Sequence, residues 1–200
     1  MSSQIFEQPI AFSFSADTLV SAKTHISKYP EGRQASAVMP LLDLAQRQSG
    51  GWLPRAAIDY VADFLDMPRI RAYEVATFYT MFNLEPVGKY HVQVCTNLPC
   101  WLRGSERIVE TVKRNIGVEV GGTSEDALFT LSEMECLGAC VNAPMMQVND
   151  DYYEDLDETS TEHILAELRR DNKPKTGSQV RRQTCEPIGG LSSLLDDVWK

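Results

Sequence analysis

Apolar residues recur every three or four positions through most of the first 85 residues, the spacing of helices that bury one face. Proline and glycine divide this stretch into short helices with brief connections. That pattern predicts a small antiparallel bundle behind an irregular N-terminal arm. The helices are expected over about residues 16–28, 34–48, 54–67 and 70–82.

Two residues shape the first two of these helices. Ser15 can cap the first helix, because a serine side chain accepts a hydrogen bond from a free N–H of the first turn. Pro40 predicts a kink or a late start in the second, because proline cannot donate to the helical ladder. The inner side of the first helix is expected to carry Leu19, Val20, Ile26 and Tyr29.

The period changes after a turn at Glu85 to Gly88. Alternation predicts strands over residues 90–95, 128–131, 145–148 and 152–156, the last two joined by a turn at residues 149–151. Helical spacing returns over residues 101–116, with Leu102 facing inward. It returns again over about residues 161–170, after a capping region at Thr159 and Ser160. The order β-α-β-β-β-α predicts a thioredoxin-like sandwich with a parallel first strand pair.

The fold class is therefore α+β, in two domains and a tail. Residues 1–85 form the helical bundle with its arm, residues 86–171 the thioredoxin-like α/β domain, and residues 172–200 an extended C-terminal tail. The tail is too short and too polar to bury a core of its own. Four apolar residues at its end need a surface to lie on: Leu191, Leu194, Leu195 and Trp199.

Charge and composition exclude some functions. A net charge of −9 argues against nucleic acid as a partner, because phosphate binding needs a basic surface. Residues 119–171 carry 14 acidic and 2 basic side chains. One interpretation is that these residues form a solvated acidic face. The other is that this face, or the basic stretch at residues 173–182, steers docking to a partner protein. No apolar run reaches the roughly 18 residues that span a membrane.

Four of the five cysteines form two close pairs, Cys95-x4-Cys100 and Cys136-x3-Cys140. With no basic secretory signal and no arginine-rich presequence at the start, an odd cysteine count favours a reducing compartment and metal or redox use. The spacing favours a [2Fe–2S] cluster, and it leaves structural zinc and disulfides open. The flanking apolar residues predict a water-poor wrapping: Leu98, Pro99, Leu137, Ala139, Val141 and Ala143.

The predicted strand order brings these thiols together. Cys95 ends the first strand, and Cys100 precedes a helix N-terminus, whose positive end suits thiolates. Cys136 and Cys140 lie in the loop after the neighbouring strand, with Gly138 allowing close approach of the backbone to sulfur. All four thiols are then expected at one sheet edge. Cys185 is interpreted as a structural or incidental thiol.

Features of a chemical active site are not evident in the sequence. There is no G-x-G-x-x-G after a strand and no P-loop, so no nucleotide cradle is expected. His25, His91 and His163 lie apart without an orienting partner, so no catalytic residue is assigned. This composition suits a one-electron carrier, which needs neither an acid nor a base.

Several motifs together carry a resemblance to a known family. They are residues 36–46, Gly51-Trp-Leu53, residues 74–82, the two cysteine pairs with Glu135 before the second, Ala143-Pro144, and Cys185-Glu-Pro-x-Gly-Gly. Over nearly its whole length the chain resembles the thioredoxin-like [2Fe–2S] ferredoxin family, in the form of the 24-kDa component of respiratory complex I (NADH:quinone oxidoreductase). One departure is the first thiol loop, where members often have small hydroxyl residues and this chain has Thr96, Asn97 and Leu98.

The resemblance implies one [2Fe–2S] cluster held by Cys95, Cys100, Cys136 and Cys140. It also implies a flavoprotein partner that binds FMN and NADH, with which the cluster exchanges electrons, and a large iron–sulfur subunit beside it. The chain would then act in catalysis only as part of the complex. It would be peripheral to the membrane, on the cytoplasmic side in bacteria or the matrix side in mitochondria. The alternatives are the similar component of an NAD-linked hydrogenase or formate dehydrogenase, and a zinc-stabilised adaptor without redox chemistry.

Overall fold

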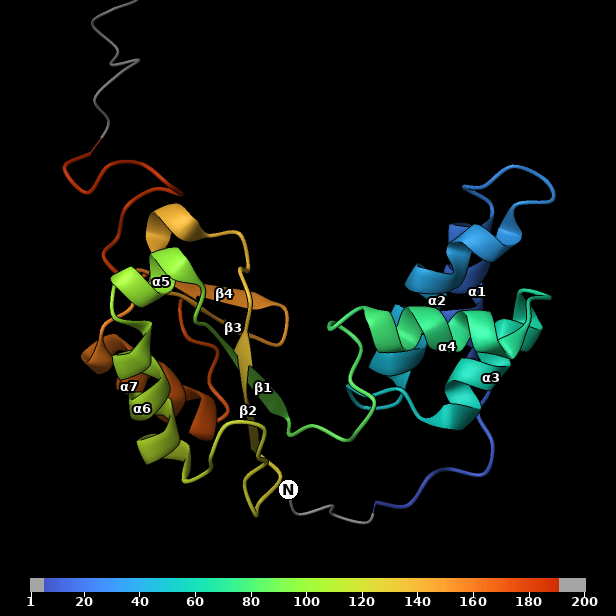
Figure 1. Ribbon diagram of the computed structural model, residues 1–200, viewed down its shortest axis with the longest axis horizontal. Coiled ribbons are helices and arrows are strands. Elements are labelled where there is room, and N and C mark those ends of the chain that lie inside the picture. The colour runs from blue at the N-terminus through green and yellow to red at the C-terminus, as the bar shows by residue number, and fades with distance from the viewer. Residues whose placement is uncertain (1–5, 191–200) are drawn as a thin grey trace, which may run out of the picture. The chain divides into compact units, whose positions relative to one another are not determined.

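The computed structural model describes residues 6–190 and divides the chain into two compact units, Met1–Val87 and Gly88–Lys200 (Figure 1). The apolar residues expected at the end of the tail, from Leu191 to Trp199, lie outside the described residues. Within residues 6–190 every helix is too short or too polar to cross a bilayer.

The first unit is helical. Its elements are α1 (Ala16–Ile26), the 3-10 helix η1 (Gln34–Ala37), α2 (Val38–Gln48), α3 (Arg55–Phe64) and α4 (Arg69–Phe78). The Ser15 side chain accepts a hydrogen bond from the Thr18 N–H at 3.2 Å, so the expected cap of α1 is confirmed. The late start expected from Pro40 is also confirmed, since the α-helix begins only at Val38. Proline then sits in the first turn, where its missing N–H costs nothing.

Two expectations for this unit are wrong in detail. Val20, expected on the inner side of α1, is 66% exposed, and Ala22 is buried instead. Leu19, Ala22 and Ile26 repeat at helical spacing, and Val20 lies about 100° away from that line. Helix α4 ends at Phe78, four residues before the expected end, because the backbone at Tyr79 is extended.

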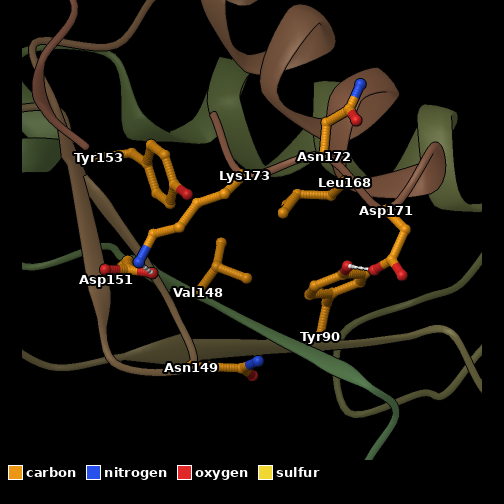
Figure 2. A pocket seen from close by; sticks show the side chains of 9 residues that line it. All are labelled: Tyr90, Val148, Asn149, Asp151, Tyr153, Leu168, Asp171, Asn172 and Lys173. Atoms are coloured by element: carbon orange, nitrogen blue, oxygen red, sulfur yellow. Dashed lines mark hydrogen bonds and ion pairs between the residues drawn. The ribbon is translucent and has the colours of Figure 1, made fainter. Parts of the chain in front are cut away.

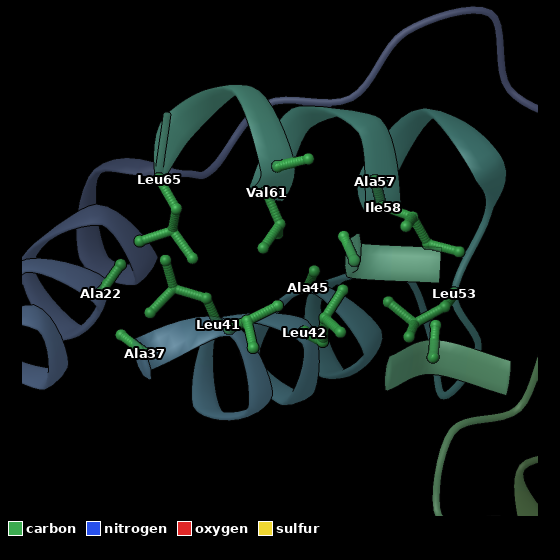
Figure 3. Packing of buried hydrophobic residues seen from close by; sticks show 14 of the residues in the cluster. Ala22, Ala37, Leu41, Leu42, Ala45, Leu53, Ala57, Ile58, Val61 and Leu65 are labelled. Atoms are coloured by element: carbon green, nitrogen blue, oxygen red, sulfur yellow. The ribbon is translucent and has the colours of Figure 1, made fainter. Parts of the chain in front are cut away.

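The core of the helical unit lies between α2 and α3. Figure 3 shows Leu41 and Leu42 of α2 reaching toward Ile58 and Val61 of α3. The N-terminal arm has no regular secondary structure over residues 6–15, yet Phe14 is buried, with its ring centroid 5.1 Å from that of Tyr60.

The second unit is built on a five-stranded sheet of order β2-β1-β3-β4-β5. Its strands are β1 (Tyr90–Cys95), β2 (Phe129–Met134), β3 (Met146–Val148), β4 (Asp151–Glu154) and β5 (Gly177–Ser178). Strand β1 is parallel to β2 and antiparallel to β3, and β3 and β4 form a hairpin. Helices α6 (Ser105–Ile116) and α7 (Glu158–Arg169) pack together over one face (Figure 1). The α+β class and the thioredoxin-like element order are confirmed.

The helix expected over residues 101–116 is broken in two. A short α5 (Leu98–Leu102) precedes α6, and Gly104 between them has φ 90°, a left-handed conformation that interrupts a right-handed helix. Leu102, expected to face inward, is therefore 69% exposed at the end of α5. Beyond the break, the apolar residues of α6 are buried: Ile108, Val109, Val112 and Ile116.

The cap of the last helix also differs from expectation. Helix α7 begins at Glu158 and is capped by Asp157, whose side chain accepts a hydrogen bond from the Ser160 N–H at 2.7 Å. The Ser160 hydroxyl oxygen accepts in return from the Asp157 N–H at 2.9 Å, completing a reciprocal capping box. Aspartate ranks among the strongest N-cap residues, and it stands earlier in the chain than the Thr159–Ser160 region.

The tail adds to the sheet, which its composition did not predict. Strand β5 pairs in parallel with β4, and Lys173 forms an ion pair with Asp151 at 2.9 Å. Figure 2 shows Lys173 beside a pocket that Tyr90 and Asp171 also line. The pocket has a volume of about 200 Å³, and the Tyr90 hydroxyl donates to Asp171 at 2.7 Å. Arg182 binds Asp155. Two basic residues of the stretch at 173–182 thus bind acidic groups of the same chain.

We predict that Asp157→Ala lowers the free energy of unfolding by about 0.5–2 kcal/mol, because the Ser160 N–H and the Ser160 hydroxyl lose the carboxylate that accepts from them. Hydrogen bonds from Ser160 hold the pKa of the Asp157 carboxyl below its usual range. The cap therefore stabilises fully above the carboxyl pKa of the unfolded chain, and this contribution falls as pH drops through the lower pKa of the folded state. Denaturant unfolding at neutral and acidic pH measures both effects. Thr159→Ala, two residues further along the chain, is the control, and an equal loss in both variants would contradict the cap.

Candidate iron–sulfur site

The four paired cysteines lie at one edge of the sheet. Cys95 is the last residue of β1 and stands opposite Met134, the last residue of the parallel strand β2. Cys136 follows two residues later, and Cys140 begins the 3-10 helix η2 (Cys140–Asn142). Because the carboxyl ends of parallel neighbours meet at the same edge, the loops after β1 and β2 start side by side. The expected placement is confirmed.

The thiols are close enough to interact as two pairs. The Cys136 and Cys140 sulfurs are 3.3 Å apart, and Cys95 and Cys100 pack in one buried cluster. Burial, together with hydrogen bonding to the Cys95 thiol and its charge, raises the pKa of Cys100 to about 12. The bond to Cys136 raises the pKa of Cys140, and the charge of Cys95 adds to it, so the two pairs feel each other electrostatically.

The two pairs differ in exposure. Cys95 and Cys100 are 2% and 1% exposed and pack with Ala143 and Met145, whereas Cys136 and Cys140 are exposed. The expectation of a water-poor wrapping is therefore right for only half of the site.

Two of the flanking apolar residues explain this. Leu98 is 61% and Val141 is 67% exposed, because α5 and η2 are short and pack on each other, which leaves each with an uncovered side.

Asn97 ties the two thiol loops together. Its side-chain oxygen accepts from the Leu98 N–H at 3.0 Å and caps α5, while its amide donates to the carboxylate of Glu135, just before Cys136. Cys100 thus lies inside the first turn of α5 rather than ahead of a helix. Gly138 has φ 91°, a left-handed conformation that favours glycine. Its role in letting the backbone approach sulfur stays a prediction.

Tyr152 supports the second thiol loop from β4. Its hydroxyl donates to the Leu137 carbonyl at 2.7 Å. Burial raises the pKa of Tyr152, and the charges of Glu154, Cys136 and Cys95 raise it further, which places the phenol near one thiol of each pair. No local pattern marks such a residue, because its contact with Leu137 depends on how β4 pairs in the sheet.

Comparison with known proteins decides the family. The sequence profile of the thioredoxin-like [2Fe–2S] ferredoxins matches residues 22–169. The chain belongs to the thioredoxin-like [2Fe–2S] ferredoxin family. The resemblance seen in the sequence is thereby confirmed.

Relatives of this ferredoxin-family chain are named as parts of NADH-quinone oxidoreductase or NADH dehydrogenase. It is 57% identical over 164 residues to the E subunit of the NADH-quinone oxidoreductase of Rickettsia prowazekii, covering 82% of this chain and 93% of the relative. It is 49% identical over 185 residues to a mitochondrial protein of Dictyostelium discoideum named NADH dehydrogenase [ubiquinone] flavoprotein 2, covering 92% and 75%.

Among solved structures, an NAD+-reducing [NiFe]-hydrogenase in the air-oxidized state shares the fold, with a TM-score of 0.57 and 18% identity. The match covers 66% of this chain and 23% of the hydrogenase chain.

The four paired cysteine thiols of the ferredoxin-family chain suit the [2Fe–2S] cluster after which the family is named. The thiols are arranged as pairs, and over residues 6–190 no three His, Cys, Asp or Glu side chains surround a single metal position. A [2Fe–2S] centre takes four cysteine thiolates, two on each iron, and two adjacent pairs match that pattern. Cys185 is an exposed free thiol, and His91 is buried in β1, bonded to the Ser132 hydroxyl at 2.9 Å.

We predict that in the cluster-free ferredoxin-family chain Cys136 reacts with iodoacetamide at neutral pH more than about 100-fold faster than Cys100, because Cys136 is exposed to the reagent and Cys100 is buried. The high pKa of Cys100 keeps it protonated, and its burial blocks access. Peptide mass spectrometry at timed intervals measures each cysteine, with exposed Cys185 as the internal control. Equal rates for Cys100 and Cys185 would contradict the asymmetry.

Proposed function

We propose that this chain is the electron-transfer subunit of an NADH:quinone oxidoreductase of the respiratory complex I type, and that Cys95, Cys100, Cys136 and Cys140 hold its [2Fe–2S] cluster. The observation that carries the proposal is the meeting of two thiol pairs at one sheet edge, one buried and one exposed. The family and the names of relatives at 49% and 57% identity support the same assignment.

The bound cluster supplies one-electron oxidation and reduction, and the residues of the chain divide the remaining work. Cys95 and Cys100, which are buried, would hold the cluster from the interior. Cys136 and Cys140, which are exposed, would hold it where a partner can approach. Electron transfer of this kind needs neither proton donor nor substrate pocket on this chain, so catalysis belongs to the assembled complex.

The partner is proposed to be the flavoprotein subunit that carries FMN and binds NADH, with the large iron–sulfur subunit beside it. Exposed apolar side chains on α5 and η2 form a surface that we name the thiol-edge patch; it consists of Leu98, Trp101, Leu102 and Val141. Contiguous exposed apolar residues are typical of protein contacts. Docking here would exclude water from the exposed thiol pair. In the assembled complex the chain would lie peripheral to the membrane, on its cytoplasmic or matrix side.

Two other functions give different results in the same preparation. A hydrogenase or formate dehydrogenase component would co-purify with a hydrogen- or formate-active partner in place of the quinone-reducing subunits. The fold similarity to the NAD+-reducing hydrogenase keeps this assembly open, although its sequence identity is only 18%. A zinc-stabilised adaptor would contain zinc and no acid-labile sulfide.

We predict two irons and two acid-labile sulfides per chain in protein purified without oxygen, with an EPR signal of a reduced two-iron centre after dithionite. Replacing any one of Cys95, Cys100, Cys136 and Cys140 by alanine should abolish normal assembly, because one iron then lacks a thiolate. Cys185→Ala is the matched control and should keep full content and spectrum.

Two outcomes would overturn these assignments. An unchanged spectrum in any one of the four ligand variants would remove that residue from the set. One zinc without sulfide, even after anaerobic reconstitution, would end the electron-transfer proposal.

We predict that Leu102→Asp weakens binding to the flavoprotein partner about tenfold or more, since a charge placed in an apolar contact must be desolvated. Its iron and sulfide content should remain that of the wild type. Val120→Asp is the control, because Val120 is 42% exposed outside the thiol-edge patch. Co-purification and titration calorimetry measure the binding, and equal affinities of the two variants would place the docking surface elsewhere.

A further inference from the structure

The tail returns to the thiol loop through a buried ion pair. The Arg182 guanidinium bonds both carboxylate oxygens of Asp155, with Nε donating to Oδ2 at 2.8 Å. The two side chains are only 8% and 5% exposed. Two hydrogen bonds from one guanidinium fix its orientation as well as its distance from the carboxylate, which a lysine ammonium cannot do.

The same guanidinium also reaches the segment that holds a thiol. Arg182 Nη2 donates to the Val141 carbonyl at 2.9 Å, and Nη1 donates to the Glu186 carbonyl at 3.1 Å. Val141 directly follows Cys140. The Arg182 side chain therefore connects the loop between β4 and α7, the tail, and the backbone next to Cys140, which is a proposed cluster ligand.

A second set of bonds holds this segment next to the first. Asn142 is 4% exposed, and its amide donates to the Thr184 carbonyl at 2.8 Å and to the Glu154 carboxylate. The Asp155 N–H donates to the Asn142 carbonyl at 2.7 Å. Residues 140–142 are thus attached to the sheet on one side and to the tail on the other.

Besides these bonds, the segment packs against α5. It is a three-residue 3-10 helix, and the Cys140 and Val141 side chains are exposed. Since a buried ion pair gives little net stability relative to apolar packing, the contribution of Arg182 lies in where it places the backbone. Ligand geometry at a metal site depends on supporting bonds of this kind.

We propose that Arg182 and the Thr184 carbonyl form a clamp that positions the Cys140 thiol for the cluster, with Arg182 as the positioning residue. The proposal rests on the ligand assignment made above for Cys140. The clamp acts on the backbone from the side of the sheet and tail, and it leaves the thiol exposed.

The experiment compares Arg182→Ala with Arg181→Ala in the full chain after anaerobic reconstitution. Arg181 is the neighbouring residue, carries the same charge and is exposed. Cluster loss to a ferrous-iron chelator is followed by absorbance, and the reduced state by EPR and by its midpoint potential. We expect Arg182→Ala to lose the cluster about 10–100-fold faster, with an altered EPR line shape and potential. Arg181→Ala should match the wild type in all three.

A double variant separates positioning from folding. Arg182→Met with Asp155→Asn removes both buried charges, so neither is left unpaired, and thermal unfolding should stay near that of the wild type. The bonds to the Val141 and Glu186 carbonyls are still absent, so fast cluster loss should persist. Arg182→Lys restores the positive charge without the planar guanidinium, so it should recover only part of the cluster retention of the wild type.

The outcomes distinguish the clamp from the ligand assignment. A wild-type chain that binds no iron and sulfide would overturn the assignment and the clamp with it. The clamp alone would be overturned by a different result. In that case the wild-type chain holds its cluster, and the folded double variant retains the cluster as well as Arg181→Ala does and gives the same EPR spectrum. Fast loss in the double variant supports the clamp even where Arg182→Ala fails to fold.

Discussion

The parallel pairing of β1 with β2 is the constraint on which the thiol site depends. Its register sets Cys95 opposite Met134, so the loops that carry the other three thiols leave the sheet together. The antiparallel neighbour β3 brings Met145 back to the same edge, where its carbonyl accepts from the Cys95 N–H at 3.2 Å. A slip of one residue would turn every side chain of β1 to the opposite face and separate the pairs.

The difference in exposure between the two thiol pairs follows from this geometry. Cys95 belongs to a central strand with neighbours on both sides, and Cys100 lies on the inner side of α5, so both are covered. Cys136 and Cys140 occupy a loop beyond the end of β2, an edge strand. A two-iron group bound across both pairs would be anchored at one end and presented at the other. This is the arrangement that an electron carrier in contact with a partner requires.

Local signals in the sequence predicted much of the site and little of its support. The strand at Tyr90–Cys95 follows from side-chain alternation, a local signal, and the meeting of the four thiols follows from the order of the elements, which favours a parallel first strand pair. Apolar spacing does not predict the helix break at Gly104, because the spacing continues across it. The glycine itself is a local signal of a break. The bond from Tyr152 to Leu137 and that from Arg182 to Val141 join residues whose proximity only the folded sheet creates. Neither has a local sequence pattern.

The tail shows how a ligand loop can be fixed without being covered. Apolar packing over Cys136 and Cys140 would hold their loop rigid, but it would also block the face on which the proposed partner docks. Hydrogen bonds to the Val141 carbonyl and from the Asn142 amide instead act on the backbone side of that loop. Both partners, Arg182 and Thr184, lie in the tail, and its two-residue strand β5 ties it to β4. A segment too polar to build a core can therefore still determine where a thiol lies, since directional bonds need few atoms and little buried area.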